Sequence, residues 1–285
     1  MLLTLSIAGA WLLATLFIFA HIKKRSKIIA FSPMRYLGLF SFVPVGIIVS
    51  WKGGDDKVWV MFLIGACIGM AGETLMALIW DFLFDKKFWV YRGGGLLGGY
   101  TSIYNIIPWG LFALIVRTLL DTFMVREEIL AGRMWGLSLW QGFLLLWLGS
   151  LLLAILWRIV WLKIQGEPIR LNEKFSWRLY SLYTAPIFIA IACVGIWGDI
   201  ALLLYALIIM ALGYLIEYIY GFLLSWAFVK NDVGSWLLWR VLHVRRRYKG
   251  WEYQYAKLNG GITSFTNLPY WALGGFYFAF ILSYL

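Results

Sequence analysis

The chain has 285 residues, of which 62% are hydrophobic, 19% aromatic and only 14% charged, and its mean hydropathy is +0.81. Because soluble domains carry about a quarter charged residues, this composition excludes an ordinary water-soluble globule and predicts an all-α polytopic membrane protein. The formal net charge of +11 is interpreted as a signal of membrane topology and not of nucleic-acid binding.

Apolar stretches of a length that favours transmembrane helices follow one another along the chain. About eight are predicted, at residues 1–21, 36–51, 58–84, 101–124, 136–162, 177–197, 200–228 and 263–285. Lysine and arginine are concentrated in alternate loops, such as "HIKKRSK" at 21–27 and "HVRRRYK" at 243–249. The positive-inside rule places these loops in the cytoplasm, so both termini are expected on the non-cytoplasmic side.

Metal-ligating residues are few. Cys67 and Cys193 fall inside predicted spans, and His21 and His243 flank basic loops. They predict neither a disulfide framework nor a metal site, and the sequence contains no nucleotide- or dinucleotide-binding motif. We therefore expect no metal and no cofactor.

One motif occurs twice. The stretch "WVYRGGGLLGGYTSIYNIIPW" at 89–109 aligns without gaps with "WEYQYAKLNGGITSFTNLPYW" at 251–271. Upstream, "FSPMRY" at 31–36 faces "FSWRLY" at 175–180, and in that register Gly69 and Glu73 match Gly213 and Glu217. The identities within the motif itself are Trp89/Trp251, Tyr91/Tyr253, Leu96/Leu258, Gly98/Gly260, Gly99/Gly261, Thr101/Thr263, Ser102/Ser264, Asn105/Asn267 and Trp109/Trp271.

The duplication predicts two repeats, at 1–130 and 131–285, with an insertion at about 231–248 in a cytoplasmic loop of the second. Each repeat holds four predicted spans. Because four is an even number, both repeats enter the membrane in the same sense and are expected to be parallel. Sites in such proteins tend to lie where the repeats meet.

Two acidic residues, Glu73 and Glu217, occupy matched positions inside predicted spans. An intramembrane carboxylate costs about 2.5–3.5 kcal/mol on insertion scales, which favours a function for both. We predict that they are catalytic, as proton donor and acceptor. The alternative is structural: each carboxyl group hydrogen-bonds a neighbouring helix, at Asn105 or Asn267, and holds the bundle together.

The repeated motif predicts a substrate-binding pocket of lipid size. Thr101 and Thr263, with their following serines, are expected to cap helices whose glycine-rich starts attract anions. Eighteen tryptophans favour an aromatic wall that stabilises a carbocation on an isoprenoid, although an aromatic belt and core packing explain them equally well. The predicted substrate-binding residues are Trp89, Tyr91, Thr101, Ser102, Asn105, Trp109, Trp251, Tyr253, Thr263, Ser264, Asn267 and Trp271.

The second half resembles bacterial ABC-transporter permease proteins of the CmpB type. The resemblance rests on Glu217, Trp251-Glu252-Tyr253, Asn259-Gly260, Leu268-Pro269 and Trp271-Ala272-Leu273-Gly274, and in the first half on Glu73 and "RGGGLLGG". The chain differs from that pattern in its arginine-rich insertion and in lacking a cysteine near the Leu-Pro pair. The resemblance implies a multi-pass protein of the bacterial inner membrane, and a permease would need a separate ATPase subunit as partner.

A second resemblance, over fewer positions, is to membrane lycopene cyclases and carotenoid hydratases. These enzymes also place an acid in one helix, a Trp-x-Tyr where the chain next enters the membrane, and a proline beyond. Their paired acids after that proline are absent here, where Asn105-Ile106-Ile107-Pro108-Trp109 stands instead.

Three functions remain open from the sequence. The leading hypothesis is a protein that binds a lipid or isoprenoid between its repeats and modifies it with Glu73 and Glu217. A transporter or permease subunit would use the same carboxylates for proton coupling. A structural or assembly subunit of a membrane complex would use them as buried braces.

Overall fold

The fold was analysed in a computed structural model. It describes residues 57–91, 95–102, 105–227, 251–258 and 261–285, together with a few isolated positions between 43 and 54. The span predicted at 1–21, the arginine-rich run at 243–250 and nearly all of the span predicted at 36–51 lie outside the described residues.

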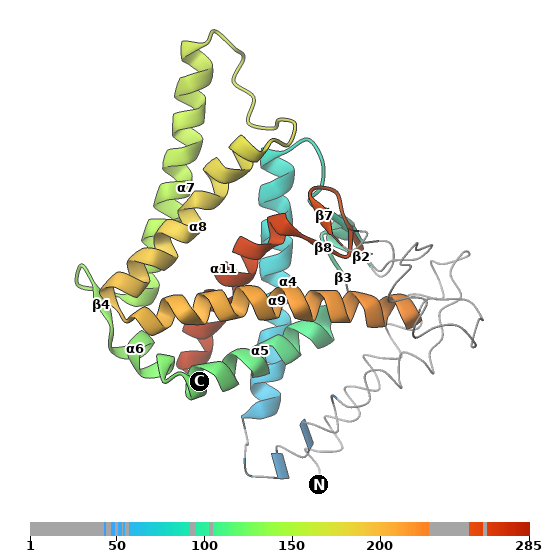
Figure 1. The fold of residues 1–285 in the computed structure, drawn as a ribbon, viewed down its shortest axis with the longest axis vertical. Helices are drawn as coiled ribbons and strands as arrows, with labels where there is room; N and C mark the ends of the chain where they lie inside the picture. Colours follow the sequence, from blue (N-terminus) through green and yellow to red (C-terminus); the bar gives the residue numbers. More distant parts are fainter. Residues whose placement is uncertain are drawn as a thin grey trace. The chain divides into compact units, whose positions relative to one another are not determined.

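The described residues are mostly helical (Figure 1). The helices are α4 (Val58–Leu83), α5 (Ile106–Thr122), α6 (Val125–Ala131), α7 (Leu139–Ile164), α8 (Trp177–Trp197), α9 (Ile200–Ala227) and α11 (Leu268–Ser283). Short strands lie between them: β1 (Trp89–Tyr91), β2 (Gly95–Leu96), β3 (Thr101–Ser102), β4 (Arg133–Met134), β5 (Leu137–Ser138), β6 (Trp251–Tyr253), β7 (Lys257–Leu258) and β8 (Thr263–Ser264).

Four of the described helices are long and apolar enough to cross a membrane, namely α4, α7, α8 and the first 22 residues of α9. Their bounds agree with the spans predicted at 58–84, 136–162, 177–197 and 200–228. α5 and α6 pass the same test only as a pair, and they are bent by 86° at their break. α11 has 16 residues, fewer than the about 20 that a span needs. The described residues therefore contain four or five candidate spans.

α7 shows most directly why these helices suit a lipid environment. Only 17% of its most apolar stretch is buried, and leucines such as Leu145, Leu152 and Leu153 are exposed. A helix that is apolar on all sides and uncovered is stable in a bilayer, where its side chains face hydrocarbon, and unstable in water. This supports the prediction of a membrane protein.

The described chain forms two compact units. The first contains the described residues up to Thr74, Trp89–Leu114 and Leu215–Phe265, and the second contains Leu75–Phe88, Ile115–Tyr214 and Thr266–Leu285. Strands β1, β2, β3, β6, β7 and β8 belong to the first unit. The hairpin of α7 and α8, which run side by side (Figure 1), belongs to the second.

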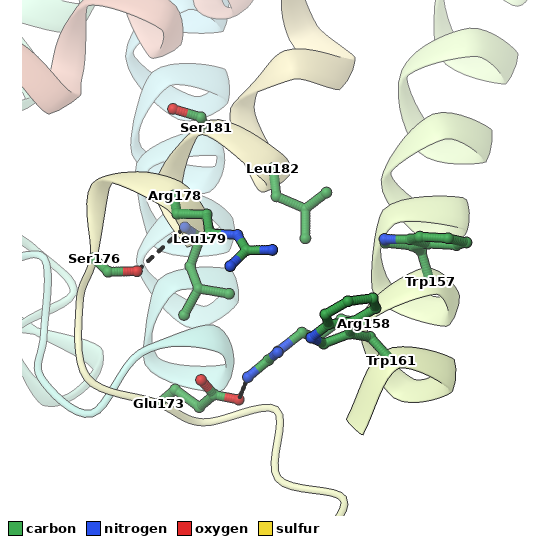
Figure 2. A pocket seen from close by; sticks show the side chains of 9 residues that line it. All are labelled: Trp157, Arg158, Trp161, Glu173, Ser176, Arg178, Leu179, Ser181 and Leu182. Atoms are coloured by element: carbon green, nitrogen blue, oxygen red, sulfur yellow. Dashed lines mark hydrogen bonds and ion pairs between the residues drawn. The ribbon is translucent and has the colours of Figure 1, made fainter. Parts of the chain in front are cut away.

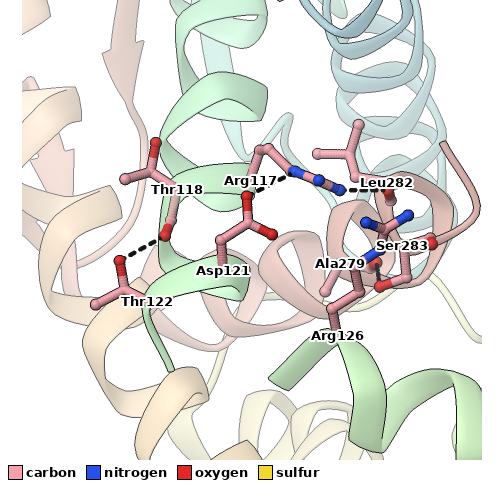
Figure 3. A network of polar contacts seen from close by, with 8 residues as sticks. All are labelled: Arg117, Thr118, Asp121, Thr122, Arg126, Ala279, Leu282 and Ser283. Carbon is pink, nitrogen blue, oxygen red and sulfur yellow. Dashed lines mark hydrogen bonds and ion pairs between the residues drawn. The ribbon is translucent and has the colours of Figure 1, made fainter. Parts of the chain in front are cut away.

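Two arginines close the C-terminal end of α11 within the second unit (Figure 3). Arg126 Nε donates to the carbonyl oxygen of Ser283 at 3.1 Å, and Arg117 Nη1 donates to that of Leu282 at 3.5 Å. Arg117 is itself held by Asp121 at 2.9 Å. The last carbonyl groups of a helix have no partner inside the helix, and cationic donors there also complement the helix dipole.

Replacing Arg126 with glutamine is expected to lower the free energy of unfolding by about 1–2 kcal/mol, because a charged donor to the end of α11 is lost. Thermal unfolding in detergent measures the effect. Arg133→Gln is the matched control, since Arg133 donates only to nearby carbonyls of its own turn at the end of α6. Equal shifts for the two variants would contradict the role assigned to Arg126.

Candidate functional site: two glutamate–tyrosine pairs

The two copies of the Trp-x-Tyr motif pair with each other. β1 and β6 form an antiparallel ribbon in which Trp89 faces Tyr253, and Tyr91 faces Trp251. The pairing register passes through the central residues, Val90 and Glu252, so the two copies of the motif are related by a local twofold axis. The first compact unit therefore joins segments that are 162 residues apart in the sequence.

One face of this ribbon carries the four aromatic residues of the motif. Alternate residues of a strand point to opposite faces, so Trp89, Tyr91, Trp251 and Tyr253 share one face. Trp89, Trp251 and Tyr253 are buried there, whereas Val90 on the other face is 38% exposed. The buried face also brings the two tyrosines to one site.

Each tyrosine hydroxyl donates to the glutamate of its own repeat. Tyr91 donates to Glu73 Oε1, and Tyr253 donates to Glu217 Oε1. Glu217 is 8% exposed. The two glutamates, which the sequence predicted as the chemical centre, thus form two equivalent carboxyl–phenol pairs held on one ribbon.

Glu73 is surrounded by hydrogen-bond donors. Thr101 Oγ1 donates to Oε2 at 2.5 Å, and the Asn105 amide lies 2.9 and 2.8 Å from the two oxygens. Trp109 Nε1 makes a longer contact with Oε2 at 3.4 Å. With Tyr91, four side chains donate to one carboxyl group, which has about four acceptor sites. The contact with Asn105 confirms the hydrogen bond that the structural alternative predicted for this residue.

These donors differ in what they can do if a proton binds to Glu73. The amide of Asn105 and the indole of Trp109 can only donate through the atoms that face Glu73. The hydroxyls of Tyr91 and Thr101 can turn and accept. A proton can therefore reach or leave Glu73 only through a hydroxyl, and Tyr91 is also bonded to the Asn105 amide at 2.5 Å.

The chain around each pair folds in the same way. The indole Nε1 of Trp89 donates to the carbonyl of Tyr100 at 3.0 Å, and that of Trp251 donates to the carbonyl of Ile262 at 2.8 Å. β2 pairs with β3 and β7 pairs with β8 in equivalent registers. Every one of these contacts recurs 162 residues later, which is the offset of the aligned motifs.

The residues predicted as helix caps have a different role. Thr101 and Ser102 form β3, and Thr263 and Ser264 form β8, so the N-cap prediction was wrong. Gly99 has a φ of +89°, which only glycine adopts readily, and a turn forms there in place of the predicted helix start. The hydroxyl of Thr101 is consequently free to turn toward Glu73 and does not serve the backbone of α5.

A glycine makes room for the tryptophan that ends each motif. A Cβ atom on Gly69 would lie 2.3 Å from the ring of Trp109, and a Cβ on Gly213 would lie 2.3 Å from the ring of Trp271. Both glycines precede the glutamate of their helix by four residues, on the same helical face. The first contact lies in the first unit and the second in the second unit.

The remaining predicted site residues are described separately. Thr263 and Ser264 are fully buried in the first unit, and Ser264 Oγ donates to the carbonyl of Tyr255 at 2.8 Å. Asn267 precedes α11 and is 8% exposed, and both it and Trp271 belong to the second unit. The structure thus gathers Glu73, Glu217 and the other described site residues of the first unit, and it describes Asn267 and Trp271 apart from them.

Burial is the main cause that raises the pKa of Tyr91 and of Tyr253 well above the usual value. For each tyrosine the charge of its own glutamate adds to the effect, and the glutamate of the other repeat contributes further. The two pairs are therefore electrostatically coupled, and both phenols keep their protons where a free tyrosine would lose its own.

The raised pKa predicts a pH dependence. The unfolded chain releases these tyrosine protons near pH 10 and the folded protein does not, so their contribution to stability is complete below about pH 10 and is lost as the pH rises above it. Ultraviolet titration of tyrosinate should give equal absorbance just above pH 10 for the folded wild type and for Tyr91→Phe with Tyr253→Phe. A larger absorbance in the wild type while it is folded would contradict the raised pKa.

Sequence reasoning placed the two tyrosines in the substrate pocket and did not pair them with the glutamates. The pattern that indicates the pairing is Trp-x-Tyr repeated beside a repeated intramembrane glutamate, because alternate strand residues share a face. Sequence reasoning also treated Arg158 and Arg178 only as topology signals, whereas both line a cavity in the second unit.

Fold and site define a helical protein with up to five candidate membrane spans among its described residues and a duplicated carboxyl–phenol site. Comparison with models of protein families, with curated proteins and with solved structures yields no match.

Proposed function

We propose that the chain is an integral membrane protein that binds a lipid or isoprenoid and exchanges protons with it through two glutamate–tyrosine pairs. The observation that carries this proposal is the pairing of Tyr91 with Glu73 and of Tyr253 with Glu217 on one face of a single ribbon. Two equivalent acid–base groups at one site allow a proton to be delivered at one point and withdrawn at another.

The proposed chemistry is an isomerisation or ring closure. One pair donates a proton to a carbon–carbon double bond, which leaves a positive charge on the adjacent carbon. A neighbouring carbon then loses its proton to the other pair, so the product is neutral and has the composition of the substrate. The aromatic faces of Trp89 and Trp251 suit the transient cation. Glu73 and Glu217 are the proposed catalytic residues.

The finer topology belongs to the same proposal. It comprises eight spans in two parallel repeats, at 1–130 and 131–285, with both termini on the non-cytoplasmic side of a bacterial inner membrane. The recurrence of contacts at an offset of 162 residues supports the duplication. Reaction of single engineered cysteines with a membrane-impermeant thiol reagent tests it: positions at the two termini should react from outside, and positions in the loop at 165–176 should not.

One observation favours a second candidate, the structural subunit. Glu73 receives hydrogen bonds from four side chains of its own chain, which is the arrangement expected of a buried brace. A brace contributes stability and has no substrate. A brace and a proton-exchanging group therefore differ in whether a discrete lipid depends on the glutamates.

The test is native mass spectrometry with lipid analysis of gently purified protein. The wild type is compared with Glu73→Gln and Glu217→Gln combined, and with Arg133→Gln as a control of unrelated position. A discrete isoprenoid or lipid that is lost or chemically altered only in the glutamine variant supports the proposal. Bulk phospholipid alone in all three samples would contradict it and favour the brace. Proton uptake into proteoliposomes that needs both glutamates but leaves all lipids unchanged would instead favour a transporter.

A further inference from the structure

A cavity of about 600 Å³ lies in the second unit between the cytoplasmic ends predicted for α7 and α8 (Figure 2). Its size is typical of small-molecule sites in proteins. α7 contributes Trp157, Arg158 and Trp161, and the start of α8 contributes Ser176 and Arg178 among others. None of these residues belongs to the glutamate–tyrosine site.

The two arginines extend into this cavity from opposite walls (Figure 2). Arg158 is paired through Nη2 with Glu173, which lies in the loop before α8. Arg178 forms no ion pair or hydrogen bond with any described residue. Two guanidinium groups and one carboxylate line the cavity, so its lining carries a net positive charge.

Arg158 also has a buried donor that the described chain leaves unsatisfied. Its Nε atom has no hydrogen-bond partner, although Nη2 of the same side chain is bonded to Glu173. A buried N–H group without a partner costs free energy, about 1–3 kcal/mol. An acceptor from outside the chain would remove that cost, and an anionic oxygen would do so most effectively.

The loop that carries Glu173 is fixed in place, which keeps the cavity formed. Asn172 Nδ2 donates at 2.8 Å to the carbonyls of both Asp81 and Phe84 at the end of α4. Glu173 forms a backbone bridge with Phe84. The ion pair of Arg158 is thus anchored at both ends, and the fork of Arg158 is preoriented.

The wall of the cavity matches a molecule that is anionic at one end and apolar at the other. Trp157 is 61% exposed, and indole rings favour the boundary between headgroups and hydrocarbon. Leu179 and Leu182 complete the lining. Arginine forks recognise phosphate oxygens, and the first turn of α8 offers additional N–H groups.

We propose that this cavity binds a phosphate group, held by Arg158 and Arg178 beside Trp157 and Trp161. The phosphate belongs to a lipid headgroup or to a soluble anion, and the experiment distinguishes the two. The site is separate from the glutamate–tyrosine pairs and holds whether or not these exchange protons.

Native mass spectrometry of delipidated full-length protein tests the proposal by titration with dioleoylphosphatidylglycerol, and separately with inorganic phosphate. Arg178→Gln is the test variant, because Arg178 has no partner among the described residues and its loss leaves the Arg158–Glu173 ion pair in place. Arg170→Gln is the matched control, which removes the same charge from the same loop without lining the cavity. The melting temperature of both variants checks that they are folded.

Arg178→Gln is expected to weaken phosphatidylglycerol binding about tenfold, and Arg170→Gln less than about twofold, because only Arg178 reaches the phosphate. Binding of inorganic phosphate alone with the same dependence on Arg178 would support the site and identify a soluble anion as its ligand. Equal weakening by the two variants would overturn the proposal, because the attraction would then be diffuse. Binding of neither probe to the wild type would also overturn it.

Discussion

Tyr91→Phe is expected to lower the free energy of unfolding by about 1.5–3 kcal/mol, because a hydrogen bond to a buried carboxyl group is lost with no water to replace it. Glu73 loses the donor to Oε1, and the Asn105 amide loses its acceptor on the phenol oxygen. Unfolding of the purified protein in mixed micelles, followed by tryptophan fluorescence, measures the change.

A double-mutant cycle shows whether the effect is specific to the pair. Tyr91→Phe and Glu73→Gln should be coupled by about 1–3 kcal/mol, because the partners are in direct contact. Tyr91→Phe and Arg133→Gln should be additive within about 0.5 kcal/mol, since Arg133 bonds only to its own turn. The matching cycle of Tyr253→Phe with Glu217→Gln should give a coupling of the same sign. Additive effects within each pair would mean that the two hydroxyls do not hold the glutamates.

Gly69→Ala is the second large effect, with an expected cost of about 1–3 kcal/mol from overpacking. The added Cβ would lie 2.3 Å from ring atoms of Trp109, so the indole must move, and its contact with Glu73 must move with it. Thermal unfolding, together with the fluorescence spectrum of tryptophan, detects both changes.

Gly72→Ala is the internal control on the same helix. A Cβ at Gly72 meets nothing within 4 Å, and alanine favours a helix, so this variant should be neutral or more stable. Gly213→Ala should repeat the loss seen for Gly69→Ala, because its Cβ would meet the ring of Trp271. Equal stability of Gly69→Ala and Gly72→Ala would show that the tryptophan does not pack where the structure places it.

The sequence predicted the four long helices well because each is a continuous apolar run with a clear end. α8 begins after Ser176, whose hydroxyl accepts from Leu179 N–H, and it ends before Gly198. The spans predicted at 101–124 and 263–285 were less accurate. Met124, in a left-handed conformation, separates α5 from α6, and no apolar pattern reports such a local backbone break.

The candidate site was predicted in its members and not in its connections. The repeat and the intramembrane position identified Glu73 and Glu217, because buried acids are costly and rarely accidental. The ribbon of β1 and β6 joins Trp89 to Tyr253 across 162 aligned positions plus the length of the motif, and nothing local in either segment specifies its partner strand. Thr101 was predicted as a cap because the pattern of glycine, threonine and serine also fits a helix start.

The cavity at Arg158 and Arg178 was missed for a different reason. Arginines at the ends of spans are explained by topology alone, so a composition argument leaves no excess to interpret. Only the backbone of the loop at 165–176 shows that Glu173 holds one arginine and leaves the other without a partner among the described residues.

Proton exchange by the two glutamate–tyrosine pairs is tested most directly by deuterium incorporation. Membranes that contain the protein are incubated in heavy water, and the mass of the lipid that copurifies with it is measured for the wild type and for Tyr91→Phe with Tyr253→Phe. We expect deuterium bound to carbon in the wild-type lipid and its loss in the variant. A bound lipid without deuterium at carbon in the wild type, from protein that is folded, would contradict proton exchange and leave the two pairs as braces of the fold.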